Sequence, residues 1–238
     1  MSGEERDGGV RCADGAPAPH EMADRCLLYY ITDRSQFGGD ERARRSALLE
    51  KIAEAARAGV DYVQLREKDL SGRELESLTK RVVAVLRQSS SSTRLLINSR
   101  IDIALAAGAD GVHLRADDVT PADVRGIVYS TIGTLLCSNF IIAASCHSGE
   151  DLARAESENI DFVVFGPVFG KSGARQASPT GLAAMGEVCR AKIPVLALGG
   201  ITMQTAAACL GAGAAGVAGI RLFQENKIED VVRAVQTA

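Results

Sequence analysis

Residues 58–68 read AGVDYVQLREK and carry the signals of one helix-to-strand unit. Gly59 stands where a helix needs a left-handed residue to end, and a buried apolar strand follows from Tyr62. The same junction recurs as AGAD at 107–110 and as GAGA at 211–214. One repeated junction predicts equivalent corners of a single architecture rather than a linker between domains.

From residue 27 onward, short apolar runs alternate with longer amphipathic stretches, which is typical of βα repeats and a parallel sheet. The predicted strands are 27–32, 62–67, 94–98, 111–114, 140–145, 162–167, 194–199 and 216–220. The clearest helices are predicted at 41–58 and 72–88, and residues 127–139 are expected to extend the fourth helix. We therefore expect an α/β fold, a single (β/α)8 TIM barrel over residues 27–238, rather than a doubly wound sheet with fewer strands.

Composition limits the function classes. A net charge of -3 and a pI near 5.7 argue against a nucleic-acid partner. No apolar run is long enough to span a membrane. Residues 1–26 lack the apolar core of a secretory signal and predict a short disordered N-terminal leader. The six cysteines form no CxxC pair, so we expect reduced thiols in a cytoplasmic protein.

The second strand ends in Gln64, Arg66 and Lys68, which alternate along the chain and so share one face. Two cations at a barrel mouth would be costly without an anion, because buried charges must be paired. We favour a phosphate or pyrophosphate partner here. The alternative is a structural network in which the two cations pair with nearby acids: Asp33, Glu67 or Asp69.

A second anion site is predicted after the seventh and eighth strands. Residues 199–202, which read GGIT, follow the seventh strand and open a helix, so the bare amides of Gly199 and Gly200 could approach a ligand. Ile220 ends the eighth strand and Arg221 follows it, at the usual phosphate site of a barrel. Two anion sites imply one long bisphosphate or two phosphorylated small molecules, and association into a homo-oligomer is left open.

Asp118 follows the fourth strand and could bind Mg²⁺, since hard cations with carboxylate ligands usually accompany pyrophosphate. Alternatively, Asp117 or Asp118 caps the helix that starts near Pro121. His147 follows the fifth strand and could transfer protons near neutral pH, or it could cap or pack at the next helix. His113 is expected to pack or to orient a neighbour.

Six blocks of the sequence resemble the thiamine phosphate synthase and TenI superfamily, over roughly residues 27–236. They are QLREK (64–68), NSR (98–100), GADGVHL (108–114), SCHS (145–148), FGPVF (165–169) and ALGGIT (197–202). The resemblance implies a (β/α)8 barrel that joins hydroxymethylpyrimidine pyrophosphate to a thiazole phosphate, with Mg²⁺, and releases pyrophosphate.

The resemblance also implies a role for individual residues. Gln64, Arg66, Lys68 and Asn98 would hold the pyrimidine diphosphate, and Asp118 would bind Mg²⁺. Ser145 would contact the pyrimidine. The thiazole phosphate would lie on the backbone amides of the last two strand ends, at Gly199, Gly200 and Ile220.

The sequence departs from the synthase pattern at three strand ends. Ser99 stands where synthases usually have an aspartate that binds Mg²⁺, and Arg221 replaces a usual serine. After the sixth strand, Lys171 or Arg175 could substitute for a pyrophosphate-binding lysine.

Synthase activity is the favoured interpretation. The leading alternative is a TenI-like thiazole tautomerase, which needs no metal aspartate and would use His147. A non-catalytic sensor of the same phosphates and an aldolase with Lys68 as a Schiff base are weaker alternatives.

Overall fold

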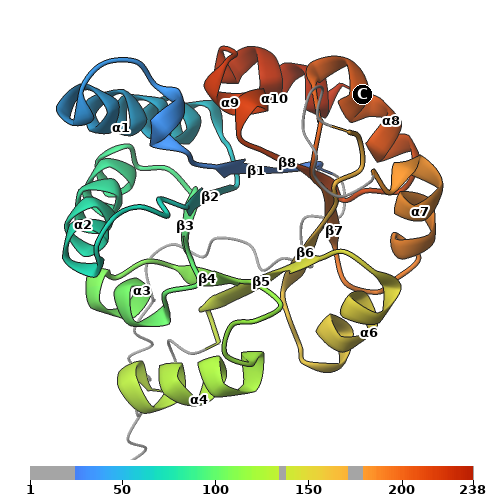
Figure 1. Cartoon of the computed structure of the whole chain (residues 1–238), viewed down its shortest axis with the longest axis horizontal. Helices are drawn as coiled ribbons and strands as arrows, with labels where there is room; N and C mark the ends of the chain where they lie inside the picture. The colour runs from blue at the N-terminus through green and yellow to red at the C-terminus, as the bar shows by residue number, and fades with distance from the viewer. Residues whose placement is uncertain (1–24, 134–137, 171–178, 238) are drawn as a thin grey trace, which may run out of the picture.

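The computed structural model describes residues 25–133, 138–170 and 179–237, and it has a closed barrel of eight parallel strands surrounded by helices (Figure 1). The strands pair in chain order, and β8 closes the ring on β1. They are β1 (Leu27–Ile31), β2 (Tyr62–Leu65), β3 (Arg94–Asn98), β4 (Gly111–Leu114), β5 (Ile141–Cys146), β6 (Phe162–Phe165), β7 (Val195–Ala197) and β8 (Gly216–Gly219). The predicted (β/α)8 barrel is confirmed, and each predicted strand lies within about two residues of the observed one.

The helices are the short 3-10 turn η2 (Arg34–Gln36), α1 (Glu41–Ala58), α2 (Gly72–Gln88), α3 (Ile101–Ala107), α4 (Pro121–Ile132), α6 (Gly149–Ser157), α7 (Gly181–Val188), α8 (Met203–Gly211), α9 (Arg221–Gln224) and α10 (Ile228–Gln236). The predictions at 41–58 and 72–88 are confirmed. The expected extension of this helix is wrong at Gly133, because α4 ends at Ile132 and its C-cap Gly133 has a φ of +79°. Residues 134–137 of the predicted extension lie outside the described residues. Within the described ranges, none of the helices has the length and apolarity needed to cross a membrane.

Most of the predicted leader, residues 1–24, lies outside the described residues. Its last two residues contact the barrel. Arg25 forms an ion pair with Asp61, and the carbonyl oxygen of Cys26 accepts a hydrogen bond from Gln236 in α10 at 2.8 Å.

The barrel interior is filled by side chains that alternate along the strands. Tyr29, Tyr62 and Phe162 pack together there, with the Tyr62 and Phe162 ring centroids 4.8 Å apart. A larger apolar layer lies between the strands and the surrounding helices. Because the interior is packed, space for a ligand is expected at the end of the barrel.

The repeated junctions of the sequence are corners of the barrel, as predicted. Three aspartates precede even-numbered strands, and each accepts a hydrogen bond from a backbone amide of the preceding strand. The pairs are Asp61 with Leu28 N at 2.8 Å, Asp110 with Leu95 N at 2.8 Å and Asp161 with Ile142 N at 2.7 Å. These carboxylates fix neighbouring strands to one another at the amino-terminal end of the barrel.

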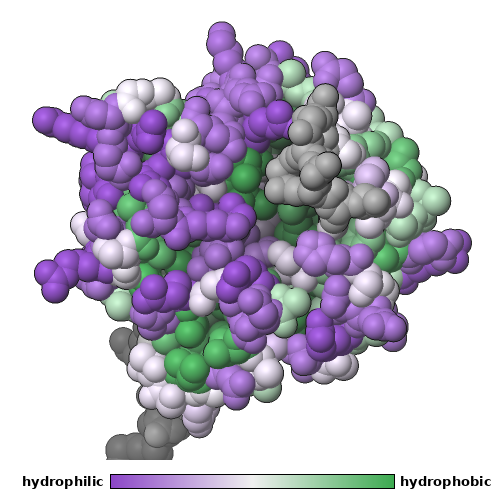
Figure 2. Space-filling model, viewed as in Figure 1, coloured by the Kyte–Doolittle hydropathy of each residue, from purple (hydrophilic) through white to green (hydrophobic). Residues whose placement is uncertain are grey.

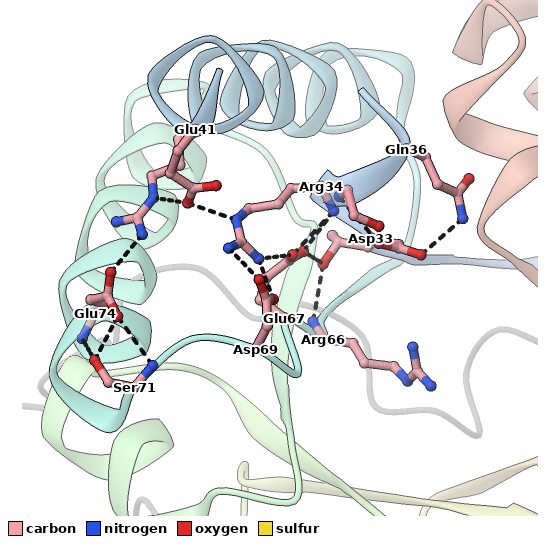
Figure 3. A network of polar contacts seen from close by, with 12 residues as sticks. Asp33, Arg34, Gln36, Glu41, Arg66, Glu67, Asp69, Ser71 and Glu74 are labelled. Carbon is pink, nitrogen blue, oxygen red and sulfur yellow. Dashed lines mark hydrogen bonds and ion pairs between the residues drawn. The ribbon is translucent and has the colours of Figure 1, made fainter. Parts of the chain in front are cut away.

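A buried arginine connects the loops that follow β1 and β2 (Figure 3). The Arg34 guanidinium donates to Glu67 at 3.0 Å and to the two oxygens of Asp69 at 2.7 and 2.9 Å. Its Nε donates to Glu41 at 2.9 Å. Glu67 is also buried and accepts from the Thr32 hydroxyl at 2.6 Å. Arg34 therefore compensates the charges of Glu67 and Asp69, and it shares Glu41 with Arg45.

This cluster overturns the alternative in which nearby acids neutralise the cations at the end of β2. Glu67 and Asp69 are bound to Arg34, and the Asp33 carboxylate accepts from the turn that follows it. In Figure 3 the Arg66 side chain extends away from Arg34 and its acids.

Replacing Arg34 tests the importance of this cluster for stability. Arg34→Ala is expected to lower the free energy of unfolding by about 3–5 kcal/mol, because the Glu67 carboxylate stays buried without its cation. Arg45→Ala is the matched control, since Arg45 pairs with the same Glu41 nearer the surface, and it should cost less than about 1 kcal/mol. Urea unfolding followed by circular dichroism measures both values. Equal losses for the two variants would contradict this assignment.

Candidate active site

A cavity of about 590 Å³ opens at the carboxyl ends of the strands. Most of the predicted site residues line it: Gln64, Arg66, Asn98, Ser145, His147, Gly199, Gly200, Ile220 and Arg221. Figure 2 shows the middle of this face as a hollow rimmed mainly by hydrophilic residues. Lys68 and Asp118 do not line the cavity, and Lys171 and Arg175 lie outside the described residues. The topology thus gathers polar groups from separate strand ends, as a barrel active site requires.

Arg66 follows the end of β2, and its position is fixed by its backbone. Its amide donates to the Thr32 hydroxyl at 3.0 Å, the same hydroxyl that binds Glu67. The half-buried Arg66 guanidinium makes no hydrogen bond or ion pair with a described residue. Burial lowers the pKa of Arg66. The negative charge of Asp33 partly offsets this effect, and repulsion from Arg115 lowers the pKa further.

Lys68 is exposed near Arg66, and its ammonium group has no ion-pair partner among the described residues. Repulsion from Arg66, then partial burial and repulsion from Arg115, lower the pKa of Lys68. Like charges held this close are stabilised by an anion, so this side of the cavity is electrostatically suited to a phosphate or diphosphate group.

Gly199 and Gly200 follow β7 and require the absence of a side chain. Their φ values are +92° and +65°, and a Cβ at Gly199 would lie 2.5 Å from the Pro167 Cα atom. A Cβ at Gly200 would lie 2.7 Å from the Phe169 Cβ atom. The amides of these glycines donate to none of the described residues, so they are free for a ligand in the loop between β7 and α8, which begins at Met203 with Thr202 as its N-cap.

A chain of hydrogen bonds crosses the floor of the cavity from Gln64 to Ser145. Gln64 Nε2 donates to the Tyr29 hydroxyl at 3.0 Å, and that hydroxyl lies 3.2 Å from His113 Nδ1. His113 Nε2 lies 2.8 Å from Ser145 Oγ. Burial, followed by repulsion from Arg66, lowers the pKa of His113 to about 3, so its imidazole is neutral at physiological pH.

The direction of this chain follows from its donors. The Tyr29 hydroxyl already accepts from Gln64, and burial raises its pKa, so it keeps its hydrogen and donates it to Nδ1 of His113. The hydrogen of neutral His113 is then on Nε2, which donates to Ser145. The Ser145 hydroxyl hydrogen is left to donate into the cavity. His113 therefore orients a neighbour, as predicted, whereas Tyr29 was not singled out from the sequence.

His147 follows β5 and directs one ring nitrogen at the protein. Its Nδ1 lies 2.6 Å from the carbonyl oxygen of Gly166, which can only accept, so Nδ1 carries the hydrogen. The backbone amide of His147 donates to Asp151 at 3.0 Å. The N-cap of α6 is Ser148, so His147 does not cap that helix. Its Nε2 atom is available to a ligand in the cavity.

Asp118 is bound to an arginine that the sequence analysis did not select. Its carboxylate accepts from the Arg115 backbone amide at 2.7 Å and from Arg115 Nη2 at 3.1 Å. Arg115 Nε donates to the Ser99 hydroxyl at 3.0 Å, and Arg115 lines the cavity. The alternative of Asp117 or Asp118 as a helix cap is wrong, because Thr120 caps α4.

The comparisons with known proteins agree with this geometry. A model of the thiamine monophosphate synthase family (TMP-TENI) matches residues 28–223. A protein of Aquifex aeolicus is 42% identical over 199 residues, which are 83% of this chain and 97% of that protein. The thiamine-phosphate synthase of Methanoculleus marisnigri is 39% identical over 194 residues, 80% of this chain and 84% of that enzyme.

A solved structure gives the same relationship in three dimensions. The thiamine phosphate pyrophosphorylase from Pyrococcus furiosus superposes with a TM-score of 0.72 at 27% sequence identity, covering 91% of this chain and 96% of that one. The family match spans β1 to α9, which includes all eight strand ends around the cavity. The chain therefore belongs to the thiamine monophosphate synthase family.

Proposed function

We propose that this chain is a thiamine-phosphate synthase that joins hydroxymethylpyrimidine pyrophosphate to thiazole phosphate. The observation that carries the proposal is the charge arrangement of the cavity. Arg66 stands at the end of β2 without an acid partner among the described residues, and Gly199 and Gly200 offer free amides at the end of β7. A reaction between two phosphorylated molecules needs two anion sites in one cavity, and this arrangement supports such a pair of sites.

The proposed reaction breaks the C–O bond between the pyrimidine methylene group and the diphosphate. The electron pair of that bond leaves with pyrophosphate, and the thiazole nitrogen forms the new C–N bond to the methylene carbon. Negative charge grows on the leaving group as the bond breaks. Arg66 would stabilise it from within the cavity by charge-assisted hydrogen bonds, and the exposed Lys68 nearby would add a second positive charge.

The pyrimidine would lie over the hydrogen-bonded floor of the cavity. Ser145 offers a donor to a ring nitrogen, since its own oxygen is occupied by His113. The thiazole phosphate would bind the amides of Gly199 and Gly200 in the loop that leads into α8, where no side chain blocks a close approach. Ile220 and Arg221 line the same side of the cavity and would complete that phosphate site.

The resemblance to synthases implies Mg²⁺, with Asp118 as its expected ligand. The residues around Asp118 do not fit such an ion in this arrangement, because both carboxylate oxygens are bound to Arg115. Across the described ranges, no group of three His, Cys, Asp or Glu side chains could hold a metal ion. No step of the proposed reaction is therefore assigned to Mg²⁺.

Product formation from the two substrates tests the proposal directly. Wild-type protein should form thiamine phosphate and release an equal amount of pyrophosphate. Arg66→Gln should lower kcat by about 10²- to 10³-fold, because the leaving group loses a preorganised charge. Arg100→Gln is the matched control, since Arg100 pairs with the exposed Asp102 and does not line the cavity. If folded protein binds both substrates without forming product, the synthase proposal fails and a sensor is favoured.

The position of His147 supports a second candidate, a thiazole tautomerase. Its Nδ1 hydrogen is held by Gly166, so Nε2 can accept and return a proton at the cavity. Ser99 fits this candidate as well, because a tautomerase would not need an acid there.

The tautomerase candidate predicts proton exchange on the thiazole ring. His147→Ala should abolish exchange of the ring hydrogen with deuterated solvent, because no other described histidine has a free ring nitrogen in the cavity. Binding of thiazole phosphate, measured by calorimetry, should change less than about threefold, since the phosphate lies on the glycine amides. Exchange at the wild-type rate in this variant would exclude His147 as the proton carrier.

A further inference from the structure

We propose that Arg115 is a third cation of the diphosphate site and that this chain binds a diphosphate through it without a bound Mg²⁺. The inference rests on the proposed function for the identity of the diphosphate. It assigns a role to a residue that neither the sequence pattern nor the resemblance singled out.

The position of Arg115 places its charge beside the cations of β2. It follows β4 at the mouth of the barrel, lines the same cavity as Arg66, and has a side chain about half exposed. Its field reaches both Arg66 and Lys68, where it adds to the repulsion already described. Cations from two strand ends thus face a common space, and an anion with several oxygens can bridge them.

Hydrogen bonds hold the Arg115 guanidinium in place. Its Nε donates to the Ser99 hydroxyl at 3.0 Å, and its Nη2 donates to Asp118 Oδ1 at 3.1 Å. Asn98 supports Ser99 from the other side, donating from Nδ2 to the same hydroxyl oxygen at 3.0 Å. The Nη1 group donates to none of the described residues. An arginine fixed on one edge and open on the other is preorganised to bind phosphate oxygens.

The neutral side chain at position 99 keeps the charge of Arg115 available. Ser99 accepts a hydrogen bond from the guanidinium but adds no negative charge. Asp118 compensates part of the charge, with one carboxylate shared between the guanidinium and the backbone amide. Asp117 lies 3.6 Å from Nε, but its side chain is 75% exposed, so water weakens that ion pair.

The same contacts leave no place for a metal ion. A magnesium ion at Asp118 would have to displace Nη2 of Arg115 and would then lie among Arg66, Lys68 and Arg115. Mg²⁺ also prefers octahedral oxygen coordination, and Ser99 offers only a neutral hydroxyl there. Arg115 occupies the carboxylate that a metal would need and supplies fixed positive charge in its place.

Calorimetry with inorganic pyrophosphate tests the inference without using enzyme activity. Wild-type protein should bind pyrophosphate in EDTA, and free Mg²⁺ should change the Kd by less than about threefold once its complex with pyrophosphate is accounted for. Arg115→Gln keeps a hydrogen-bonding side chain but loses the charge, and should weaken binding in EDTA by about tenfold or more. Arg100→Gln is the matched control and should bind like wild type.

A reciprocal variant exchanges the arginine for a possible metal site. Ser99 has a φ of +61°, a conformation that aspartate tolerates better than most residues, so Ser99→Asp combined with Arg115→Gly should fold. Its thermal transition, measured first, checks this. The double variant should bind pyrophosphate weakly in EDTA and at least about tenfold more tightly with Mg²⁺.

Two results would overturn the inference: a wild-type protein that needs Mg²⁺ to bind pyrophosphate, or an Arg115→Gln variant that binds it unchanged. Either result is distinct from failure of the proposed function. A protein that makes thiamine phosphate only with Mg²⁺ would refute the inference and keep the synthase. A protein that binds pyrophosphate without metal but makes no product would keep the inference about Arg115 and refute the synthase.

Discussion

The buried pair between Arg34 and Glu67 determines the electrostatics of the whole cavity. Gln64 at the end of β2 and Arg66 just after it line the cavity, whereas Glu67 and Asp69 in the same loop are bound to Arg34. Arg34 binds the two acids on the helix side, at 3.0 and 2.7 Å. Arg66 at the cavity and Lys68 near it are consequently left without an acid partner from their own loop. A loop whose own four charges cancel thus presents positive charge to the cavity, because Arg34 binds its two acids.

The sequence determined much of the fold because each barrel corner carries its own local signals. A glycine ends α1 at Gly59 and α3 at Gly108, both with positive φ, and a buried apolar strand follows each. Patterns of this kind identify elements well and boundaries less well. The strand end at Leu65 depends on Thr32, which binds both the Arg66 amide and Glu67 across the neighbouring loop. That contact links residues far apart in the sequence, and no local pattern encodes it.

Site residues could be predicted where a polar or charged side chain stands at the end of a strand. They could not be predicted where contact with another residue changes what the side chain can bind. Most of the selected residues line the cavity. Tyr29 was missed because it lies in the apolar run of β1 and looks like any other core residue. Arg34 was missed because no local sequence pattern indicates that its side chain is buried. Asp118 illustrates the opposite error. Its carboxylate next to a pyrophosphate site suggested a metal ligand, whereas Arg115, three residues earlier, occupies it. Only an i to i+3 charge pair in the loop after β4 could have signalled that contact.

Membership of the family does not by itself fix the reaction, since the cations of β2 are shared by synthases and tautomerases in the resemblance. The additional charge of Arg115 bears on that choice. A tautomerase binds one phosphate, for which the amides at Gly199 and Gly200 suffice. Keeping three cations close together at the ends of β2 and β4 raises the free energy of the unliganded protein, because Arg115 disfavours the charge of Arg66 and both disfavour the charge of Lys68. A second, more highly charged anion would relieve this repulsion when it binds. The same cations would then stabilise that anion as it leaves. The charge at β2 and β4 therefore favours a reaction in which a diphosphate is the leaving group.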